Sequence, residues 1–215
     1  MSIDSRLDDY IAAHSSPEGE YLYNLYRATN IEILNPHMAS GQVQGRLLKL
    51  LVKMMRPKRI LEIGTYTGYS AICMAEGLDE GGKLYTFEID DELEDFTRRW
   101  IEGSPVADKI VFTIGSALDI VPTMNERFDL VFIDGNKREY TAYYEMALAH
   151  LNEGGWIIAD NTLWDGWIID EKRQDAQTNG VRAFNDYVRA DKRVEEVILP
   201  LRDGLTIIRK KTDKE

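Results

Sequence analysis

The sequence predicts a doubly wound α/β fold, in which a seven-stranded, mostly parallel sheet ends in an antiparallel hairpin. Short apolar runs alternate with helix-like stretches from Lys58 onward, and repeated βα units form parallel sheets with right-handed crossovers. The first apolar run passes through Gly64 and Gly68 into a helical pattern. The last two runs are joined by the five residues 200–204, which are too few for a crossover helix and therefore imply a hairpin.

Three helices are expected before the sheet. Apolar residues recur at helical spacing over 3–14 and 17–34, and Pro17 followed by acidic residues is typical of a helix start. Asn35-Pro36-His37 interrupts this pattern, and a third helix with one apolar face from Val43 to Met55 ends before Pro57. We expect residues 1–56 to cover one side of the sheet or to shape the mouth of its ligand site.

The remaining elements alternate along residues 57–215, the expected sheet core. Since the chain has 215 residues and shows no internal repeat or linker, we expect a single domain over 1–215. The expected strands are 59–63, 83–88, 109–113, 128–133, 154–159, 194–199 and 205–210. The expected helices are 69–78, 91–102, 138–151 and 179–190.

The overall composition favours a small-molecule substrate. A net charge of −11 argues against a nucleic-acid partner, which would need a basic face. The single cysteine excludes an intramolecular disulfide and fits a reducing, cytoplasmic location. The start of the chain is too charged for a signal peptide, and no apolar run approaches membrane-spanning length. No membrane partner is therefore expected.

The glycine turn within residues 59–70 narrows the choice of ligand. Its pattern, Glu62-x-Gly64-x-x-x-Gly68, has one glycine fewer than a dinucleotide fingerprint and an acid inside the strand. This suits a ligand that contains adenosine and an amino acid but no pyrophosphate. Glu88, near the end of the next strand, can accept from both hydroxyls of a ribose. The combination resembles the S-adenosylmethionine site of class I methyltransferases, whose Rossmann-like sheet ends in the same hairpin. An ordinary strand-turn-helix with incidental glycines is the alternative.

Two further strands end in acids, Asp134 and Asp160, and Asn161 follows the second. If these strands are parallel neighbours, their ends lie about 5 Å apart, and both carboxylates can reach one ion. Two carboxylates and an amide oxygen favour a hard cation, Mg²⁺ first and otherwise Mn²⁺ or Ca²⁺, over zinc. Three protein ligands would leave room for a vicinal diol on an aromatic ring. Alternatively, the two acids merely cap the helices that follow.

Two neighbouring features have open interpretations. Lys137 lies at the expected start of a helix, where a cation is unfavourable, so it is a candidate to take a phenolic proton or to hold a phenolate. A solvated surface lysine is the alternative. Trp164, Trp167 and Ile168 follow the second acid in a loop, where they form either local packing or the wall of a substrate site.

Several motifs together resemble the cation-dependent O-methyltransferases, which include the caffeoyl-CoA and catechol O-methyltransferases. They are MASGQVQGRLL at 38–48, EIGTYTGYS at 62–70, FIDGNKREY at 132–140, DNTLW at 160–164 and DGLTIIR at 203–209. The similarity spans about residues 35 to 210, and the motifs occur in the family's order.

The resemblance implies methyl transfer from S-adenosylmethionine to a hydroxyl of a small phenolic substrate, assisted by a divalent cation, in a homodimer. The family's metal ligands correspond to Asp134, Asp160 and Asn161, its catalytic residues to Lys137 with Asp134, and an aromatic residue near the substrate to Trp164. The cofactor contacts correspond to Met38, Ser40, Gln44, Glu62, Gly64, Tyr66, Gly68, Ser70, Glu88, Ala117 and Asp134.

Three departures from the family pattern accompany this resemblance. Gln44 stands where an acid is usual near the methionine part of the cofactor, and Asn136 stands where an aspartate is common beside the metal. No basic cluster suits the phosphates of coenzyme A. The rival functions are an NAD-dependent oxidoreductase, which would need a third glycine in the turn, and a non-catalytic cofactor-binding module, against which Asp134, Lys137, Asp160 and Asn161 argue.

Overall fold

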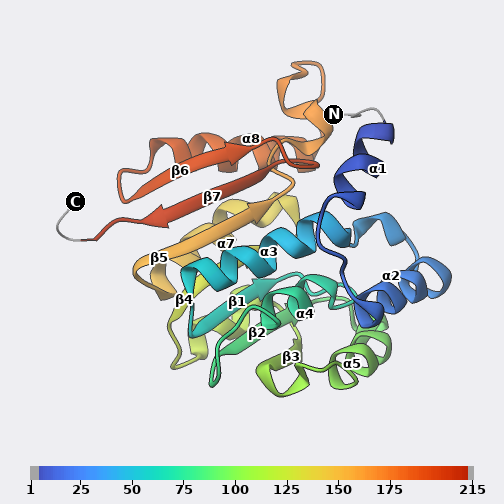
Figure 1. Ribbon diagram of the computed structural model, residues 1–215. Helices are drawn as coiled ribbons and strands as arrows, with labels where there is room; N and C mark the ends of the chain where they lie inside the picture. The colour runs from blue at the N-terminus through green and yellow to red at the C-terminus, as the bar shows by residue number, and fades with distance from the viewer. Residues whose placement is uncertain (1–4, 213–215) are drawn as a thin grey trace. The chain divides into compact units, whose positions relative to one another are not determined.

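The computed structural model describes residues 5–212. Within this part of the chain the strands are β1 (Arg59–Ile63), β2 (Lys83–Glu88), β3 (Ile110–Ile114), β4 (Phe128–Ile133), β5 (Leu151–Asp160), β6 (Val194–Leu199) and β7 (Leu205–Lys210). They form one seven-stranded sheet in the order β3-β2-β1-β4-β5-β7-β6 (Figure 1). β4 pairs with β5 in parallel, whereas β7 runs antiparallel to both β5 and β6. The predicted fold class, including the terminal hairpin, is therefore confirmed.

The α-helices of the described chain are α1 (Ser5–Ala13), α2 (Glu20–Glu32), α3 (Gly41–Met55), α4 (Tyr69–Ala75), α5 (Glu94–Glu102), α6 (Ala117–Ile120), α7 (Tyr140–His150) and α8 (Ala176–Ala190). The 3-10 turns are η1 (Pro36–Met38), η2 (Asp91–Leu93), η3 (Ala107–Lys109), η4 (Val121–Thr123), η5 (Lys137–Glu139) and η6 (Trp164–Ile169). The break expected at Asn35-Pro36-His37 corresponds to η1.

Several predicted boundaries were wrong by a few residues. α2 starts at Glu20 rather than at residue 17, because Gly19 precedes it with a φ of 87°. The helix expected at 91–102 begins as the 3-10 turn η2, and α4 ends at Ala75 rather than at 78. The first two residues of the helix expected at 3–14 lie outside the described residues.

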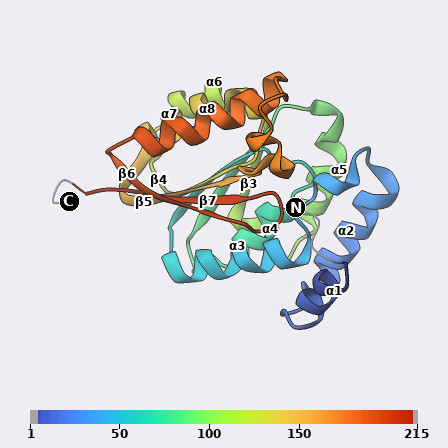
Figure 2. The same ribbon diagram turned by 90° about the horizontal axis from the view of Figure 1, so that it is seen from above.

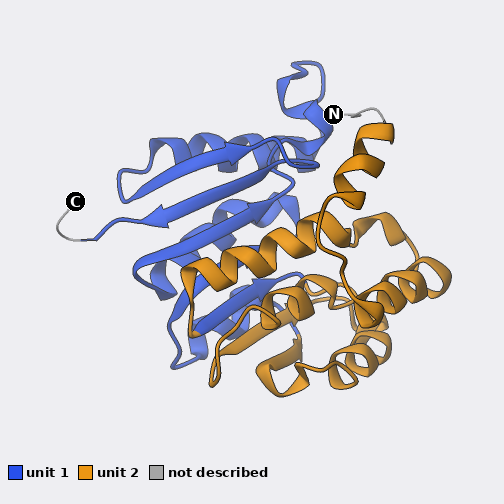
Figure 3. Cartoon of the chain, viewed as in Figure 1, with its two compact units in different colours: residues 1, 59–64, 115–215 blue, residues 2–58, 65–114 orange. Residues whose placement is uncertain are grey.

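Contacts between Cα atoms divide the chain into two compact units, coloured separately in Figure 3. In the described chain, unit 1 comprises residues 59–64 and 115–212, and unit 2 comprises residues 5–58 and 65–114. The expectation of a single domain, with a helical cover over 1–56 and a sheet core over 57–215, stays a prediction.

Unit 1 contains the parallel strands that carry the predicted acids. Ile63 pairs with Ile133, and Ile133 pairs with Ala159, so β1, β4 and β5 end at one edge of the sheet. Helices α6, α7 and α8 lie along one face of these strands (Figure 2). Phe128, Phe132 and Phe184 are fully buried, which provides the apolar core that fixes this edge.

Unit 2 contains β2, β3 and the helices α1–α5. Gly45 permits α3 to approach α4 closely, since a Cβ at this position would lie 2.6 Å from Cys73 Sγ. Cys73 is fully buried, as expected for core packing. The Tyr21 hydroxyl donates to the Trp100 carbonyl at 2.6 Å and joins α2 to α5. Between residues 5 and 212, no helix is both long and apolar enough to cross a membrane.

Candidate active site

The glycine turn of unit 2 is fixed by hydrogen bonds to neighbouring elements. Gly68 has a φ of 86°, and its N–H donates to the Thr65 carbonyl at 2.9 Å. The hydroxyls of Thr65 and Thr86 lie 2.6 Å apart, and the Thr97 hydroxyl donates to the Tyr66 carbonyl. A strand and a helix therefore hold the turn rigidly, as a ligand cradle requires.

Glu88, the predicted ribose contact, lies directly against this turn. The residue is buried, and one carboxylate oxygen accepts the Tyr66 N–H at 2.7 Å. The other oxygen accepts the N–H groups of Ile89 and Asp90 at 2.9 and 3.0 Å. Three backbone donors thus fix the carboxylate, and because each oxygen has two lone pairs, one acceptor site remains, on the oxygen that accepts the Tyr66 N–H.

Tyr66 connects the turn to the segment that carries Met38. Its hydroxyl donates to the Leu34 and Asn35 carbonyls at 2.9 and 3.2 Å. Burial raises the pKa of the Tyr66 hydroxyl, so this group remains a donor. Met38 follows at the end of η1 and is 55% exposed. The structure therefore brings together Tyr66, Gly68, Glu88 and the Met38 segment, which are far apart in the sequence.

The other unit 2 candidates for cofactor binding are Ser40, Gln44 and Ser70, which are all buried. Thr67 lies within the glycine turn, and its hydroxyl oxygen is buried without a hydrogen-bond partner among the residues the structure describes. A buried orphan hydroxyl calls for a partner, and a polar ligand at the turn would supply one. This corner therefore fits an adenosine-containing cofactor.

At the strand edge of unit 1, the predicted acids lie on adjacent strands. Asp134 and Asp160 directly follow the paired residues Ile133 and Ala159, which confirms that the two acid-tipped strands are parallel neighbours. A Cβ at Gly64 would lie 2.3 Å from the Asp134 carbonyl oxygen. Only glycine permits this approach, so the start of the glycine bend packs on the first acid.

Asp134, Asp160 and Asn161 carry the oxygen atoms that a hard cation would require as ligands. Asp160 is 5% exposed, and its Oδ1 accepts the Asn161 N–H at 2.8 Å. Asn161 adopts the left-handed region with a φ of 54°. Within residues 5–212 no group of three or more His, Cys, Asp or Glu side chains could hold a metal ion. A cation here would therefore depend on the amide oxygen as well as on the two carboxylates.

Asp134 does not serve as a helix cap. The N-cap of η5 is Asn136, whose side chain accepts the Arg138 N–H at 3.3 Å. The capping alternative is therefore wrong for Asp134, and the departure from the family pattern at Asn136 has a structural role of its own.

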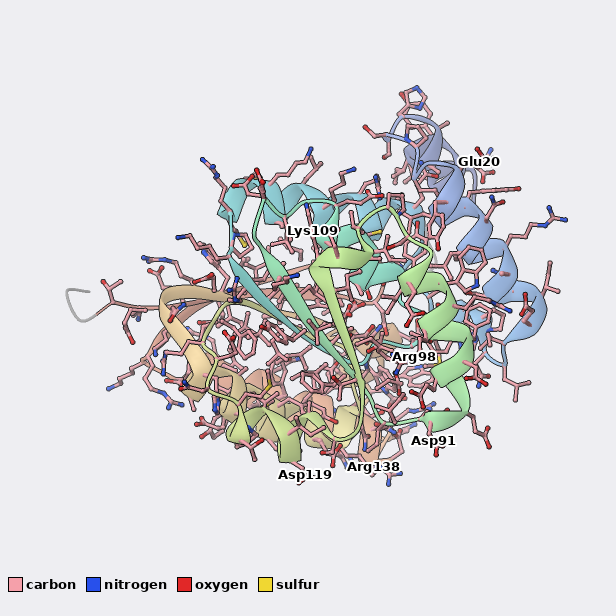
Figure 4. All side chains as sticks on the ribbon, turned by 90° about the horizontal axis from the view of Figure 1, so that it is seen from below. Glu20, Asp91, Arg98, Lys109, Asp119 and Arg138 are labelled. Atoms are coloured by element: carbon pink, nitrogen blue, oxygen red, sulfur yellow. The ribbon has the colours of Figure 1, made fainter. Side chains whose placement is uncertain are left out.

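Lys137 is a buried partner of this acid group. It is 8% exposed, and its Nζ donates to Asp134 Oδ1 at 2.9 Å and to the Gly135 carbonyl at 3.2 Å. By contrast, the neighbouring Arg138 is exposed and points outward (Figure 4). The interpretation of Lys137 as a solvated surface lysine is therefore wrong.

Tyr140 also belongs to this site, although no sequence pattern had assigned it a role. Its hydroxyl donates to the Asp160 carbonyl at 2.9 Å, and its ring centroid lies 4.8 Å from Lys137 Nζ. Burial raises the pKa of this hydroxyl well above its ordinary value, and the charges of Asp134 and Asp160 act in the same direction. Its position three residues after Lys137, at the start of the next helix, could have indicated that it lies near Lys137.

Asp203 is a second residue that the sequence analysis left without a role. Its carboxylate accepts the Asp165 N–H and a hydrogen bond from the Asn161 side chain, and its carbonyl accepts the Leu163 N–H at 2.8 Å. Burial raises the pKa of this carboxyl above its ordinary value. Asp203 lies in the loop between β6 and β7, so only tertiary structure places it beside Asn161.

Residues 162–173, here called the aromatic loop, lie next to Lys137. The rings of Trp164 and Trp167 meet edge to face at a centroid distance of 6.1 Å, and Lys137 Nζ lies 5.9 Å from the Trp164 ring centroid.

Of the candidates for cofactor binding in unit 1, Glu62 lies fully buried in β1, and Ala117 is buried at the start of α6. No described contact links Ala117 to the acids.

The family model described as O-methyltransferase matches residues 12–211. The chain belongs to this O-methyltransferase family. The resemblance predicted from the sequence motifs is thereby confirmed, and family membership leaves the NAD-dependent oxidoreductase without support.

Relatives and solved structures agree with this assignment. The chain is 35% identical over 183 residues to a catechol O-methyltransferase of Niastella koreensis, covering 82% of this chain and 83% of that protein. It is 33% identical over 185 residues to caffeoyl-CoA O-methyltransferase 1 of Eucalyptus globulus, covering 80% and 75%. The crystal structure of the O-methyltransferase TomG from Streptomyces achromogenes, in complex with SAM (S-adenosylmethionine), superposes with a TM-score of 0.89 at 29% identity, covering 99% and 100%.

Proposed function

We propose that this O-methyltransferase moves the methyl group of S-adenosylmethionine to a hydroxyl of a small catechol-like or caffeoyl-type aromatic substrate, assisted by a divalent cation. The observation that carries the proposal is the grouping of Asp134, Lys137, Asp160 and Asn161 at the edge of unit 1 where Gly64 packs on Asp134. The names of the catechol and caffeoyl-CoA relatives support the substrate class.

In unit 2, the proposed task is to bind the methyl donor. Glu88 is held by three backbone N–H groups, and its remaining acceptor site would take a ribose hydroxyl of the cofactor. Tyr66 and Gly68 would shape the turn against the ligand, and Met38, Ser40, Gln44 and Ser70 would complete the contacts. The SAM complex of TomG, a structure similar over the whole chain, supports this assignment. Glu62, Gly64, Ala117 and Asp134 are the cofactor contacts proposed for unit 1.

In unit 1, the proposed task is to prepare the acceptor hydroxyl. Asp134, Asp160 and Asn161 would hold the divalent cation, Mg²⁺ before Mn²⁺ or Ca²⁺, which when bound supplies Lewis-acid activation of an adjacent hydroxyl. Lys137 would assist removal of the phenolic proton or stabilise the phenolate by its charge. Trp164, whose ring faces Lys137 Nζ, would form one wall for the aromatic ring.

The reaction balances without a further reactant. The phenolic O–H bond breaks, and its proton passes to water while the ammonium of Lys137 stabilises the phenolate by its charge. The oxygen forms a bond to the methyl carbon while the carbon–sulfur bond of the sulfonium breaks. The products are a monomethyl ether and S-adenosylhomocysteine. The enzyme holds the substrate so that its oxygen points toward the methyl group, and such orientation supplies a large part of the rate enhancement.

The test is direct methylation by the purified protein. S-adenosylmethionine and a panel of acceptors that includes catechol and caffeic acid are supplied with Mg²⁺, and the products are measured by mass spectrometry. We expect a monomethyl ether, whose formation stops with EDTA and in Asp160→Ala but not in Asp186→Ala, an exposed acid on α8. Turnover that survives both EDTA and Asp160→Ala would falsify the role of the cation. Absence of turnover with every acceptor would contradict the enzyme assignment.

Two further expectations stay predictions. Exposed apolar side chains on the N-terminal helices, among them Leu7, Tyr10, Tyr23 and Ile31, could form the face of a homodimer. Light scattering of the full chain tests this, with twice the monomer mass of 24.7 kDa as the expected result. The cytoplasmic location expected from the cysteine content requires imaging or fractionation.

A further inference from the structure

The aromatic loop has an unfavourable local conformation. Trp164 and Asp165 adopt positive φ values of 46° and 52°, which side-chain-bearing residues rarely do. The Trp164 Nε1 atom is buried and has no hydrogen-bond partner in the described chain, which is a further cost. Groups outside residues 164–169 must therefore hold this conformation in place.

Asp203 contacts the first part of the loop, where it accepts the N–H groups of Leu163, Trp164 and Asp165. Arg182, on helix α8, contacts the second part. Its Nε donates to the Ile168 carbonyl at 2.9 Å, and its Nη1 donates to the Arg173 carbonyl at 2.7 Å. Its Nη2 donates to the carbonyls of Trp167 and Asp170 at 2.9 and 2.5 Å. One guanidinium thus binds four carbonyls between residues 167 and 173.

The chemistry of arginine suits this task. A guanidinium offers five N–H donors in a rigid plane, whereas a lysine ammonium offers three donors from a single point on a flexible stem. A fifth hydrogen bond, from Nη1 to Asn179 Oδ1 at 3.0 Å, fixes the guanidinium against α8 itself. The contacts therefore join the loop to a helix and not to another loop.

The same helix also holds other parts of the acceptor site. Asn185 donates through Nδ2 to the Thr162 carbonyl at 2.8 Å, directly after Asn161. A Cβ at Gly180 would lie 2.3 Å from the Lys137 carbonyl oxygen, so α8 touches the η5 turn without a side chain between them. Helix α8 and the loop lie side by side in Figure 1 and Figure 2. Three residues of one helix thus contact two segments of the site, the aromatic loop and the η5 turn.

We propose that Arg182 is a positioning residue, which holds the aromatic loop against the acceptor site and so sets the affinity for the aromatic acceptor without touching it. The effect on acceptor affinity rests on the proposed function, whereas the role of Arg182 in holding the loop rests on the hydrogen bonds described above. Loss of Arg182 is expected to release the loop, to weaken acceptor binding and to leave binding of S-adenosylmethionine intact.

Limited proteolysis tests the structural part. Trypsin can cleave after Lys172 and Arg173, inside the segment that Arg182 holds. In Arg182→Ala we expect cleavage at these two sites to be at least about tenfold faster than in the wild type, since local opening governs such cleavage. Arg189→Ala is the matched control, because it removes an arginine of the same helix whose side chain is 84% exposed. Equal cleavage rates in the wild type and Arg182→Ala would overturn the proposal.

Steady-state kinetics test the functional part. We expect Arg182→Ala to raise KM for the phenolic acceptor about tenfold or more, with KM for S-adenosylmethionine within about twofold of the wild type. Arg182→Lys should recover only part of the acceptor affinity. A faster loop cleavage with an unchanged acceptor KM would overturn the role in substrate binding. Equal increases in both KM values, with a lower Tm, would also overturn it, because they indicate general damage to the fold.

The two arms separate this proposal from the proposed function. If the wild type methylates none of the phenols, the proposed function fails together with the role of Arg182 in acceptor affinity, while proteolysis still decides whether Arg182 holds the loop. If Arg182→Ala does not fold, loop cleavage and acceptor KM are measured in Arg182→Lys and Arg182→Gln instead. Wild-type cleavage rates and wild-type acceptor KM values in both of these variants would contradict the proposal.

Discussion

The proposed cofactor corner in unit 2 and the acid edge in unit 1 are built in different ways. In the corner, one carboxylate, Glu88, accepts three backbone N–H groups, and two of these come from the residues that immediately follow it. At the acid edge, Asp134, Asp160 and Asp203 come from the ends of three different strands or loops. A corner built from local backbone donors can be recognised from short-range spacing, whereas an edge assembled from distant segments requires the fold.

The partners of the charged groups also differ between the two regions. Glu88 accepts hydrogen bonds from backbone N–H groups, while Asp134 faces the ammonium of Lys137 at 2.9 Å. Changes in the corner should therefore alter the affinity for the methyl donor. Changes at the acid edge should alter the chemical step or the acceptor. Four substitutions would test this division.

Lys137→Met should have the largest effect. Removal of a positioned acid–base group typically costs about 10²–10⁴ in rate, so we expect kcat to fall by that factor while the Kd of S-adenosylmethionine stays unchanged. Single-turnover kinetics and calorimetry measure the two quantities. Arg138→Met, at the exposed neighbouring position, serves as the control and should retain kcat. A decrease of less than about tenfold in Lys137→Met would remove Lys137 from the mechanism.

Glu88→Gln should produce the opposite pattern. The neutral side chain keeps one acceptor oxygen but loses the charge-assisted hydrogen bonds, which are worth about 1.5–3 kcal/mol each. We therefore expect the Kd of S-adenosylmethionine to rise about 10- to 100-fold, with kcat at saturating cofactor within a few-fold of the wild type. The control is Glu92→Gln, at an exposed position of η2. If kcat collapses at saturation, the two regions do not divide binding and chemistry.

The features that the sequence predicted correctly depend on short-range patterns and on topology. Asp134 and Asp160 each follow an apolar run, and the two strands are parallel neighbours, as the metal-site hypothesis required. The five residues 200–204 predicted the hairpin of β6 and β7. The position of Glu88 beside the glycine turn followed from the ribose rule for such sheets.

The contributions of Asp203, Tyr140 and Arg182 could not be predicted in this way. The loop partners of Arg182 are backbone carbonyls 9 to 15 positions away. Because every residue has a backbone carbonyl, the sequence does not indicate which of them Arg182 contacts. Asp203 contacts Asp165 across 38 positions of sequence. By contrast, the helix expected at 179–190 starts at Ala176, and this error was avoidable, because Asp175 followed by Thr178 is a helix-cap signal.

Gly180→Ala should have an intermediate effect on both stability and rate. The added methyl group would meet the Lys137 carbonyl at 2.3 Å, and such overpacking typically costs about 1–3 kcal/mol. We expect a lower free energy of unfolding in urea and a lower kcat, since the η5 turn must shift. Gly77→Ala is the matched control in unit 2, where the methyl group would lie 2.7 Å from the Lys49 carbonyl. The control should lose stability without loss of kcat, and equal loss of kcat in both would show that the effect is not local to the acid edge.

Asp175→Ala should have the smallest effect, although it acts on the helix that holds the acid edge. The Asp175 carboxylate accepts the Thr178 N–H at 3.0 Å as the N-cap of α8, and this hydrogen bond lowers the pKa of the carboxyl below its ordinary value. Because the folded-state pKa is depressed, the stabilisation is complete above the unfolded-state pKa of about 3.9 and is lost as the pH falls through the folded-state value. We therefore expect the Tm of Asp175→Ala to be about 2–4 °C lower at pH 7, with the difference shrinking below about pH 4. Calorimetry at pH 7 and pH 3 measures this difference, and a Tm gap that is independent of pH would show that the cap does not depend on the charge of Asp175.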